Sequence, residues 1–189
     1  MQRESKPDRL GPLSMEKMTN AQRVVAQAII DGPRGAVYGP FVPLLRSPEL
    51  MQHAQRMGEY LRFRSAIGPR LSELAILVTA RQWNQKVEWA IHAPIAAKCG
   101  IDRAIIDAIA HRQPPPGLRE DEAAVIEFCT ELHCEKAVCD ATYAKARSLF
   151  GEHGIVDLMG LNGYYTFLAM IMNSAQTAVP ADTEWLLPD

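Results

Sequence analysis

The sequence predicts an all-α fold of about eight helices, arranged as a single domain that spans residues 1–189. Apolar residues make up 48% of the chain and recur at three- and four-residue intervals in several stretches. Gly, Pro and helix-capping residues separate these stretches. β-Branched residues show no sustained alternation of period two, so we expect no sheet. A length of 189 residues suits one domain of this kind.

The first third of the chain predicts two helices joined by a structured loop. Residues 15–30 have helical periodicity that stops at Asp31-Gly32-Pro33, because Gly suits a helix C-terminus and Pro cannot continue the helix. Residues 31–43 hold three glycines and three prolines around aromatic anchors, which is typical of an ordered loop. Ser47-Pro48-Glu49 gives the next helix an N-cap hydroxyl, a first-turn Pro and a first-turn acid. This helix should end near Ile67-Gly68-Pro69.

The remaining helices follow from the same signals. Residues 71–81 form a strongly apolar helix, and Asn84 is the expected N-cap of a helix that runs to Cys99 and ends at Gly100. The rhythm of the last helices echoes the first half and suggests a duplicated helical unit. The later helices are expected at 103–110 (capped by Asp102), 121–134, 140–150 and 155–175, with a Pro-rich breaker at 114–117.

Composition and charge exclude several classes of function. The chain has 20 basic and 22 acidic side chains and a net charge of −2, so no electrostatic surface for nucleic acid or anionic membrane is predicted. No apolar run approaches the roughly 18–20 residues that span a bilayer. Residues 1–10 lack the apolar core of a secretory signal. Four cysteines are too few for a disulfide scaffold, so we expect a reduced, cytoplasmic protein with a small-molecule substrate.

Three titratable residues between positions 73 and 92 are the candidates for catalysis. Glu88 and His92 are four residues apart and share one helix face amid apolar neighbours, where each can shift the pKa of the other and form a proton shuttle. Glu73 lies beside an apolar run, where a buried acid is unexpected. The residues alone leave alternatives open, because such a Glu–His pair is common on solvated faces and Glu73 could interact with the helix N-terminus.

The sequence resembles the carboxymuconolactone decarboxylase superfamily, which includes the alkyl hydroperoxidase D-like proteins. The resemblance rests on Arg-Leu-x-Glu-Leu-Ala-Ile-Leu at 70–77 and on Glu-Trp-x-x-His-x-x-x-Ala-x-x-x-Gly-Ile at 88–101. It is best over residues 45–112, and the segment at 160–173 is similar to the last helix of longer members. It implies an alkyl hydroperoxidase D-like helical bundle, with helices 121–175 packed on the core, that forms a trimer or hexamer.

The chain departs from the peroxidase branch of that superfamily at its two thiols. Glu73 and His92 match the Glu and His of the branch, but Gln85 and Glu88 stand where its Cys-x-x-Cys pair belongs. Reduction of a hydroperoxide by a dithiol needs a thiolate and a resolving thiol, which Gln85 and Glu88 cannot supply. Cys99 lies about two helical turns beyond His92 and has no second cysteine at a suitable spacing.

The resemblance therefore implies an acid–base lyase or isomerase acting on a small cyclic carboxylic acid or lactone, as in aromatic-compound catabolism. Decarboxylation of an unsaturated lactone implies no metal and no organic cofactor, since the lactone carbonyl itself accepts the electrons. In this reading His92 donates the proton, Glu88 orients it and Glu73 is a second acid–base group. Arg81 and Gln85 are the candidate substrate ligands, although Arg81 is also explained as a surface or inter-subunit charge. A peroxidase-like antioxidant and a non-catalytic oligomeric protein are the alternatives.

One structural requirement follows from a shared site. Glu73 and His92 would lie about 28 Å apart on one straight helix. Their approach therefore requires a break in the helix, which we expect at residues 82–84.

Overall fold

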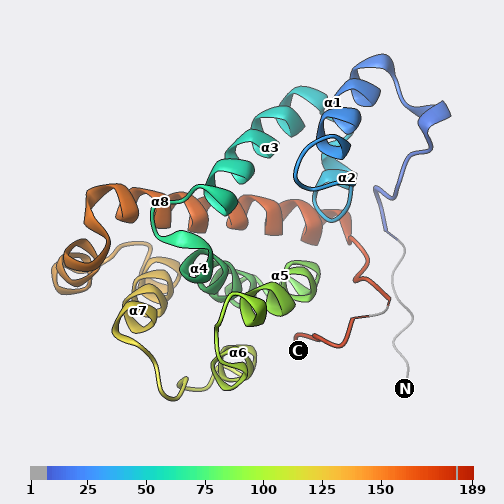
Figure 1. Ribbon diagram of the computed structural model, residues 1–189. Coiled ribbons are helices and arrows are strands. Elements are labelled where there is room, and N and C mark those ends of the chain that lie inside the picture. The colour runs from blue at the N-terminus through green and yellow to red at the C-terminus, as the bar shows by residue number, and fades with distance from the viewer. Residues whose placement is uncertain (1–7, 182) are drawn as a thin grey trace.

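A computed structural model describes residues 8–181 and 183–189, and this part of the chain is helical without a strand (Figure 1). The predicted all-α class is confirmed. The elements are the short 3₁₀ helix Met15–Lys17 and the helices α1 (Asn20–Ile30), α2 (Phe41–Leu44), α3 (Pro48–Phe63), α4 (Gly68–Gln82), α5 (Lys86–Lys98), α6 (Arg103–Ala110), α7 (Glu120–Glu135) and α8 (Asp140–Ala175).

Helix α4 is the centre of the molecule. It packs against α5, α7 and α8, and every residue from Leu71 to Arg81 is buried. A helix that is covered on all sides needs an apolar sequence, which explains the uninterrupted run at 74–78. The few polar side chains of α4 are buried with it and therefore require partners in the interior.

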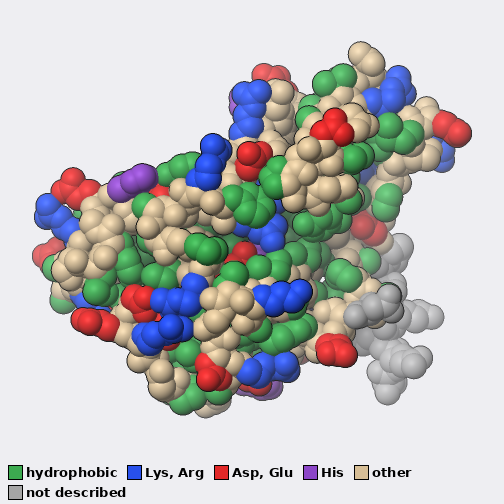
Figure 2. All heavy atoms as spheres, in the orientation of Figure 1, with side chains coloured by type: hydrophobic (Ala, Val, Ile, Leu, Met, Phe, Trp, Pro, Cys, Tyr) green, Lys and Arg blue, Asp and Glu red, His purple; other side chains and the backbone are tan. Residues whose placement is uncertain are grey.

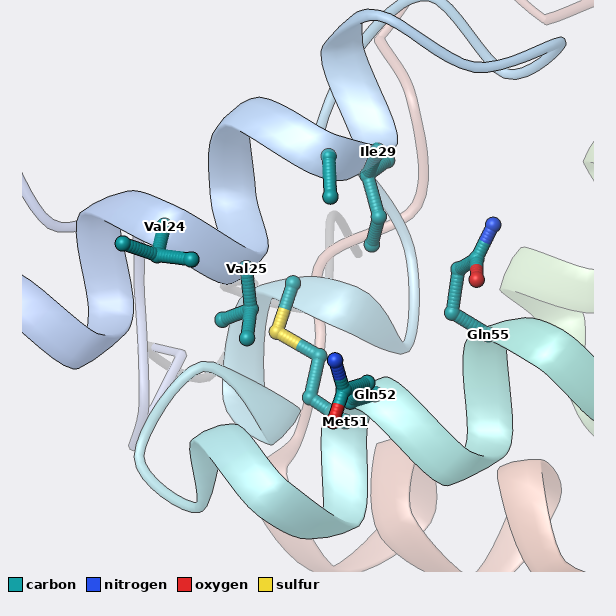
Figure 3. Close-up of a pocket in the computed structure, with 7 residues that line it drawn as sticks. Val24, Val25, Ile29, Met51, Gln52 and Gln55 are labelled. Atoms are coloured by element: carbon teal, nitrogen blue, oxygen red, sulfur yellow. The ribbon is translucent and has the colours of Figure 1, made fainter.

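Helices α1 to α3 form a lobe at one end of the bundle (Figure 1). Val25 and Ile29 of α1 face Met51 of α3 across a shallow apolar hollow, as Figure 3 shows. The predicted single helix at 15–30 is divided, because Thr19 forms a capping box with Gln22 and starts α1 anew.

Helix α3 also differs from the prediction at both ends. It starts at Pro48 as expected, but the Ser47 side chain makes no capping hydrogen bond. It ends at Phe63, four residues before the Ile67-Gly68-Pro69 stop. The turn at 64–67 that follows it is fixed by Asp157 of α8, whose Oδ2 accepts a hydrogen bond from the Ala66 backbone at 2.7 Å. This contact depends on a residue 91 positions away, so local sequence could not predict it.

The long helix α8 is two helices joined at Gly151, whose backbone (φ 65, ψ 178) leaves the helical region. This agrees with the predicted helices at 140–150 and 155–175. Within the described chain, α8 is the one element long and apolar enough to cross a membrane, but 56% of its most apolar window is buried in the fold. Such burial is typical of a core helix of a soluble protein.

Basic and acidic side chains intermingle over the face in Figure 2.

Ion pairs attach α7 to the start of α4. The Arg70 guanidinium bonds Glu122 Oε1 at 2.7 Å and also pairs with Asp121. Glu122 is 1% exposed and receives a second cation from Arg119 at 3.0 Å. These pairs join α7 to α4, and α8 packs on α4 as well.

Candidate functional site

The turn between α4 and α5 brings the two halves of the candidate site together. The helix breaks after Gln82, as the approach of Glu73 and His92 requires. Asn84 is not the N-cap that we expected, because its backbone is left-handed (φ 48). Gln85 is the cap, and its Oε1 accepts from the backbone N–H groups of Val87 and Glu88 at 2.7 and 3.3 Å.

Glu73 and His92 form a buried pair. The Nδ1–H of His92 donates to Oε2 of Glu73 at 2.6 Å, and the two side chains are 7% and 4% exposed. The other oxygen of Glu73 lies 3.5 Å from Nε of Arg62 on α3. Three helices thus hold a line of cation, carboxylate and imidazole. With Nδ1 occupied, Nε2 is the ring nitrogen that His92 can offer to a ligand.

Glu88 is a buried acid in the same place but does not pair with His92. No hydrogen bond joins the two side chains in the described structure, and Oε2 of Glu88 is buried without a partner. Burial raises the pKa of Glu88 well above its ordinary value, and the negative charge of Glu73 raises it further. Glu88 is therefore not the orienting partner of His92 that we predicted, because Glu73 has that position.

Glu88 and His92 line one small cavity. It encloses about 20 Å³, enough for a single water molecule, between α5, α8, α3 and the loop after α1. Its wall includes Arg34, Arg62 and Tyr164. Seven side-chain polar atoms in the described chain are buried without a hydrogen-bond partner, and three of them, Arg34 Nε, Glu88 Oε2 and Tyr164 Oη, belong to residues of this cavity. Such a concentration of unpaired groups indicates a site for a polar ligand.

Two tyrosines complete the wall on the α8 side. The ring of Tyr165 meets that of His92 edge-on with 5.2 Å between centroids, and Tyr164 meets Tyr165 in the same way at 5.3 Å. Burial raises the pKa of both hydroxyls, so both remain neutral donors. Gly58 allows this arrangement, because a Cβ there would lie 2.1 Å from Tyr164 Oη and 2.7 Å from Arg34 Nη2.

Sequence reasoning missed four of these residues: Arg34, Arg62, Tyr164 and Tyr165. The tyrosines lie in the 160–173 segment that carried part of the resemblance, which was a usable signal. The arginines come from a loop and from α3, and no local pattern distinguishes them from surface charges.

The two predicted substrate ligands lie elsewhere. Arg81 is eight residues after Glu73, about 12 Å along α4, and its Nη1 donates to the Pro188 carbonyl at 2.7 Å. It lines a different cavity. Gln85 caps α5, and its Nε2 donates to Asn173 Oδ1 at 2.8 Å. Neither side chain lines the cavity beside His92, because each is held by contacts that the sequence spacing does not reveal.

The cysteines do not form a redox pair in this structure, where all four are free thiols. Cys99 follows the last residue of α5 and does not line the cavity. Burial raises its pKa, an effect that Glu73 increases. Burial also raises the pKa of Cys129, to about 12. A raised pKa keeps a thiol protonated and poorly nucleophilic.

Solved structures share this fold. A peroxidase-related protein from Ralstonia eutropha JMP134 with an alkylhydroperoxidase AhpD core is 14% identical, with a TM-score of 0.75 over 94% of this chain and 95% of its own. A peroxidase-related protein from Silicibacter sp. TM1040 is 13% identical, with a TM-score of 0.75 over all of both chains. A cysteine-to-alanine variant of the debrominase Bmp8, in complex with 2,3,4-tribromopyrrole, is 13% identical, with a TM-score of 0.73 over 94% and 95%.

These likenesses, together with the all-helical architecture, define the fold class: the chain has an AhpD-like helical fold. No protein-family model and no curated protein matches the sequence itself. Within this fold the chain carries a Glu–His pair beside a small cavity, with Gln85 and Glu88 at the positions where the resemblance predicts thiols.

Proposed function

We propose that this protein is a cofactor-free acid–base lyase or isomerase of the carboxymuconolactone decarboxylase type, acting on a small cyclic carboxylic acid or lactone. The observation that carries the proposal is the cavity beside His92. His92, which is hydrogen-bonded to Glu73, lines it together with Glu88 and two arginines, and burial raises the pKa of Glu88. Neighbouring titratable side chains whose environments differ in this way are typical of general acid–base catalysis.

The arginines give the cavity an affinity for an anionic substrate. Arg34 has a buried Nε without a partner, whereas the Nε of Arg62 already faces Glu73. Arg34 is therefore our candidate for binding the substrate carboxylate, in place of Arg81, because Arg62 is already paired with Glu73. The Tyr164 hydroxyl, also unpartnered, can donate to the same ligand.

In the proposed reaction the bond between the ring carbon and the carboxylate carbon breaks, and carbon dioxide leaves. The electron pair moves into the conjugated lactone carbonyl and forms an enolate. Neutral Glu88 donates a hydrogen bond to the enolate oxygen, as an acid with a raised pKa can do near neutral pH. Nε2 of protonated His92 then delivers a proton to carbon, while Glu73 stabilises the imidazolium and fixes its orientation.

A ring-sized substrate requires the cavity to open, since about 20 Å³ admits only water. Arg34, Tyr38, Pro40 and Phe41 form one wall and belong to the segment between α1 and α3. Three of these four residues belong to the loop before α2, and Phe41 is the first residue of that short helix. We therefore expect this segment to move outward when the substrate enters.

The test measures carbon dioxide release from a panel of carboxylated unsaturated lactones. His92→Ala should lower turnover by about 10²–10⁴-fold, the range for a general acid–base group. Cys99→Ser is the matched control and should stay within a few-fold, because the mechanism has no thiol step. Circular dichroism should show that both variants are folded. Unchanged turnover in His92→Ala would refute the role of His92.

The names of the structural neighbours favour a second candidate, a peroxidase-like antioxidant. This activity would depend on Cys99 and on a dithiol reductant. Peroxide consumption measured with and without dithiothreitol separates the two functions. Loss of activity in Cys99→Ser, with His92→Ala nearly intact, would support the peroxidase and contradict the acid–base reading.

We also propose that the protein is a cytoplasmic homo-oligomer, a trimer or hexamer by analogy with the superfamily. Large apolar side chains are exposed on α1 and α3, among them Val24 (60%) and Met57 (46%). Burial of these side chains against a second copy would remove apolar surface from water. Light scattering coupled to gel filtration tests this proposal, and a monomer mass at micromolar concentration would contradict it.

A further inference from the structure

A second and larger cavity lies at the other end of α4. It has a volume of about 300 Å³, which is in the range of small-molecule sites, between α4, the segment after α6 and α7. Val78, Ile109 and Ile126 give it an apolar wall, and Pro114 and Pro115 of the breaker segment close one side. Apolar walls of this size suit the body of a small organic molecule.

Arg81 supplies a buried cation to this cavity. The residue is 6% exposed, and one guanidinium nitrogen, Nη1, donates to the Pro188 carbonyl. Its Nε is buried without a hydrogen-bond partner. A guanidinium that is more than nine-tenths buried and keeps an unused donor in a cavity wall is costly unless a ligand accepts from it.

Arg112 places a second positive charge next to the first. Its Nη2 donates to the Arg81 backbone carbonyl at 3.2 Å and to Asn84 Oδ1 at 3.0 Å. Burial, followed by this neighbouring charge, lowers the pKa of Arg81. None of the described residues that line the cavity is acidic. The two arginines thus both line this cavity, and the acidic residue that acts on Arg81, Asp189, lies outside its lining.

The C-terminal residue shows which charge is favoured here. The negative charge of Asp189 raises the pKa of Arg81, whereas the positive charge of Arg112 lowers it. Asp189 Oδ1 also pairs with Lys86 Nζ at 2.5 Å. The chain itself thus places an anionic residue beside the arginines. An anion on a small ligand would gain the same attraction inside the cavity.

We propose that this cavity is a binding site for a small organic carboxylate with an apolar body. The carboxylate lies between Arg81 and Arg112, and the apolar part packs on Val78, Ile109 and Ile126. The site is separate from the cavity beside His92, with no lining residue in common. It therefore does not depend on the proposed decarboxylase chemistry.

Calorimetric titration of the full-length protein with benzoate tests the proposal. Benzoate should bind in the millimolar range or tighter, as a ligand of this size can. Benzamide has the same shape without the charge, and inorganic phosphate has charge without the apolar body, so both should bind more weakly. Arg112→Gln should weaken benzoate binding by about 10–100-fold, the equivalent of one charge-assisted hydrogen bond.

Two further variants keep the result interpretable. Thr130→Trp fills the cavity from α7 and should abolish binding even if Arg112→Gln does not fold. Arg147→Gln removes an exposed arginine of α8 outside the cavity and should leave the affinity unchanged. Equal binding of benzoate and benzamide, equal binding of benzoate and phosphate, or no effect of Arg112→Gln and Thr130→Trp would overturn the proposal. Absence of benzoate binding to the wild type would also overturn the proposal. If the oligomer mass then changes in Arg112→Gln, a second copy of the chain covers the site instead.

Discussion

Replacement of Glu88 by Gln should change how the stability of the protein depends on pH. Glu88 is 2% exposed, and burial and the nearby Glu73 charge raise its pKa. In the unfolded chain the same carboxyl titrates near its ordinary pKa of about 4.3. Between these two pKa values the native state keeps a proton that the unfolded state has lost. Wild-type stability should therefore fall as the pH rises through this window.

The expected slope follows from one proton. The free energy of unfolding of the wild type should lose about 1.4 kcal/mol per pH unit from this group within the window. Glu88→Gln removes the titration, so its free energy of unfolding should rise relative to wild type by the same amount per unit. Two pH units into the window the relative gain is about 3 kcal/mol. The buried amide of Glu88→Gln, which has no hydrogen-bond partner, changes the free energy of unfolding by the same amount at every pH. It therefore leaves the slope of that free energy against pH unchanged.

Urea denaturation at half-unit steps between pH 4 and pH 8 measures these slopes. Glu49→Gln is the matched control, because Glu49 also lies in the first turn of a helix but is exposed. Its curve should run parallel to that of the wild type. If the Glu88→Gln curve is parallel as well, Glu88 is ionised in the folded protein and the proposed hydrogen bond to an enolate fails.

The remaining predictions concern the support of the site. Gly58→Ala should destabilise the protein by about 1–3 kcal/mol through its clash with Tyr164, although Ala usually favours a helix. Gly163→Ala in the open part of α8 should instead stabilise it by about 0.5–1 kcal/mol, and thermal unfolding of the two variants shows the contrast. Gln85→Ala should lower stability by about 1–2 kcal/mol, because it removes a helix cap and the bond to Asn173. A change in substrate KM for Gln85→Ala, with no loss of stability, would restore Gln85 as a ligand.

Local chemistry was enough to predict most elements. Asp102 caps the helix at 103–110, and the predicted boundaries match those of α6. The approach of Glu73 and His92 was expected from the resemblance, and a break at 82–84 was expected because one straight helix would keep them apart. The structure has both the break after Gln82 and the contact at 2.6 Å.

The sequence did not predict which side chains from distant elements would pair. Glu88 and His92 have the spacing of a helix pair, yet the imidazole contacts Glu73, which also pairs with Arg62 of another helix. Asn84 is a good capping residue type, but the tight turn puts it in the left-handed region and leaves the cap to Gln85. Such choices depend on how helices pack, which residue spacing does not contain.

The two positions that lack thiols have defined physical roles in this chain. Where the resemblance predicts the first cysteine, Gln85 saturates two backbone donors at the start of α5. At the second position, Glu88 brings a carboxyl group whose pKa is raised by burial into the cavity wall. One replacement stabilises the turn that joins Glu73 to His92, and the other supplies a donor beside them. Under the proposed function, both residues suit proton transfer rather than thiol chemistry, and the raised pKa of Cys99 makes that thiol a poor nucleophile.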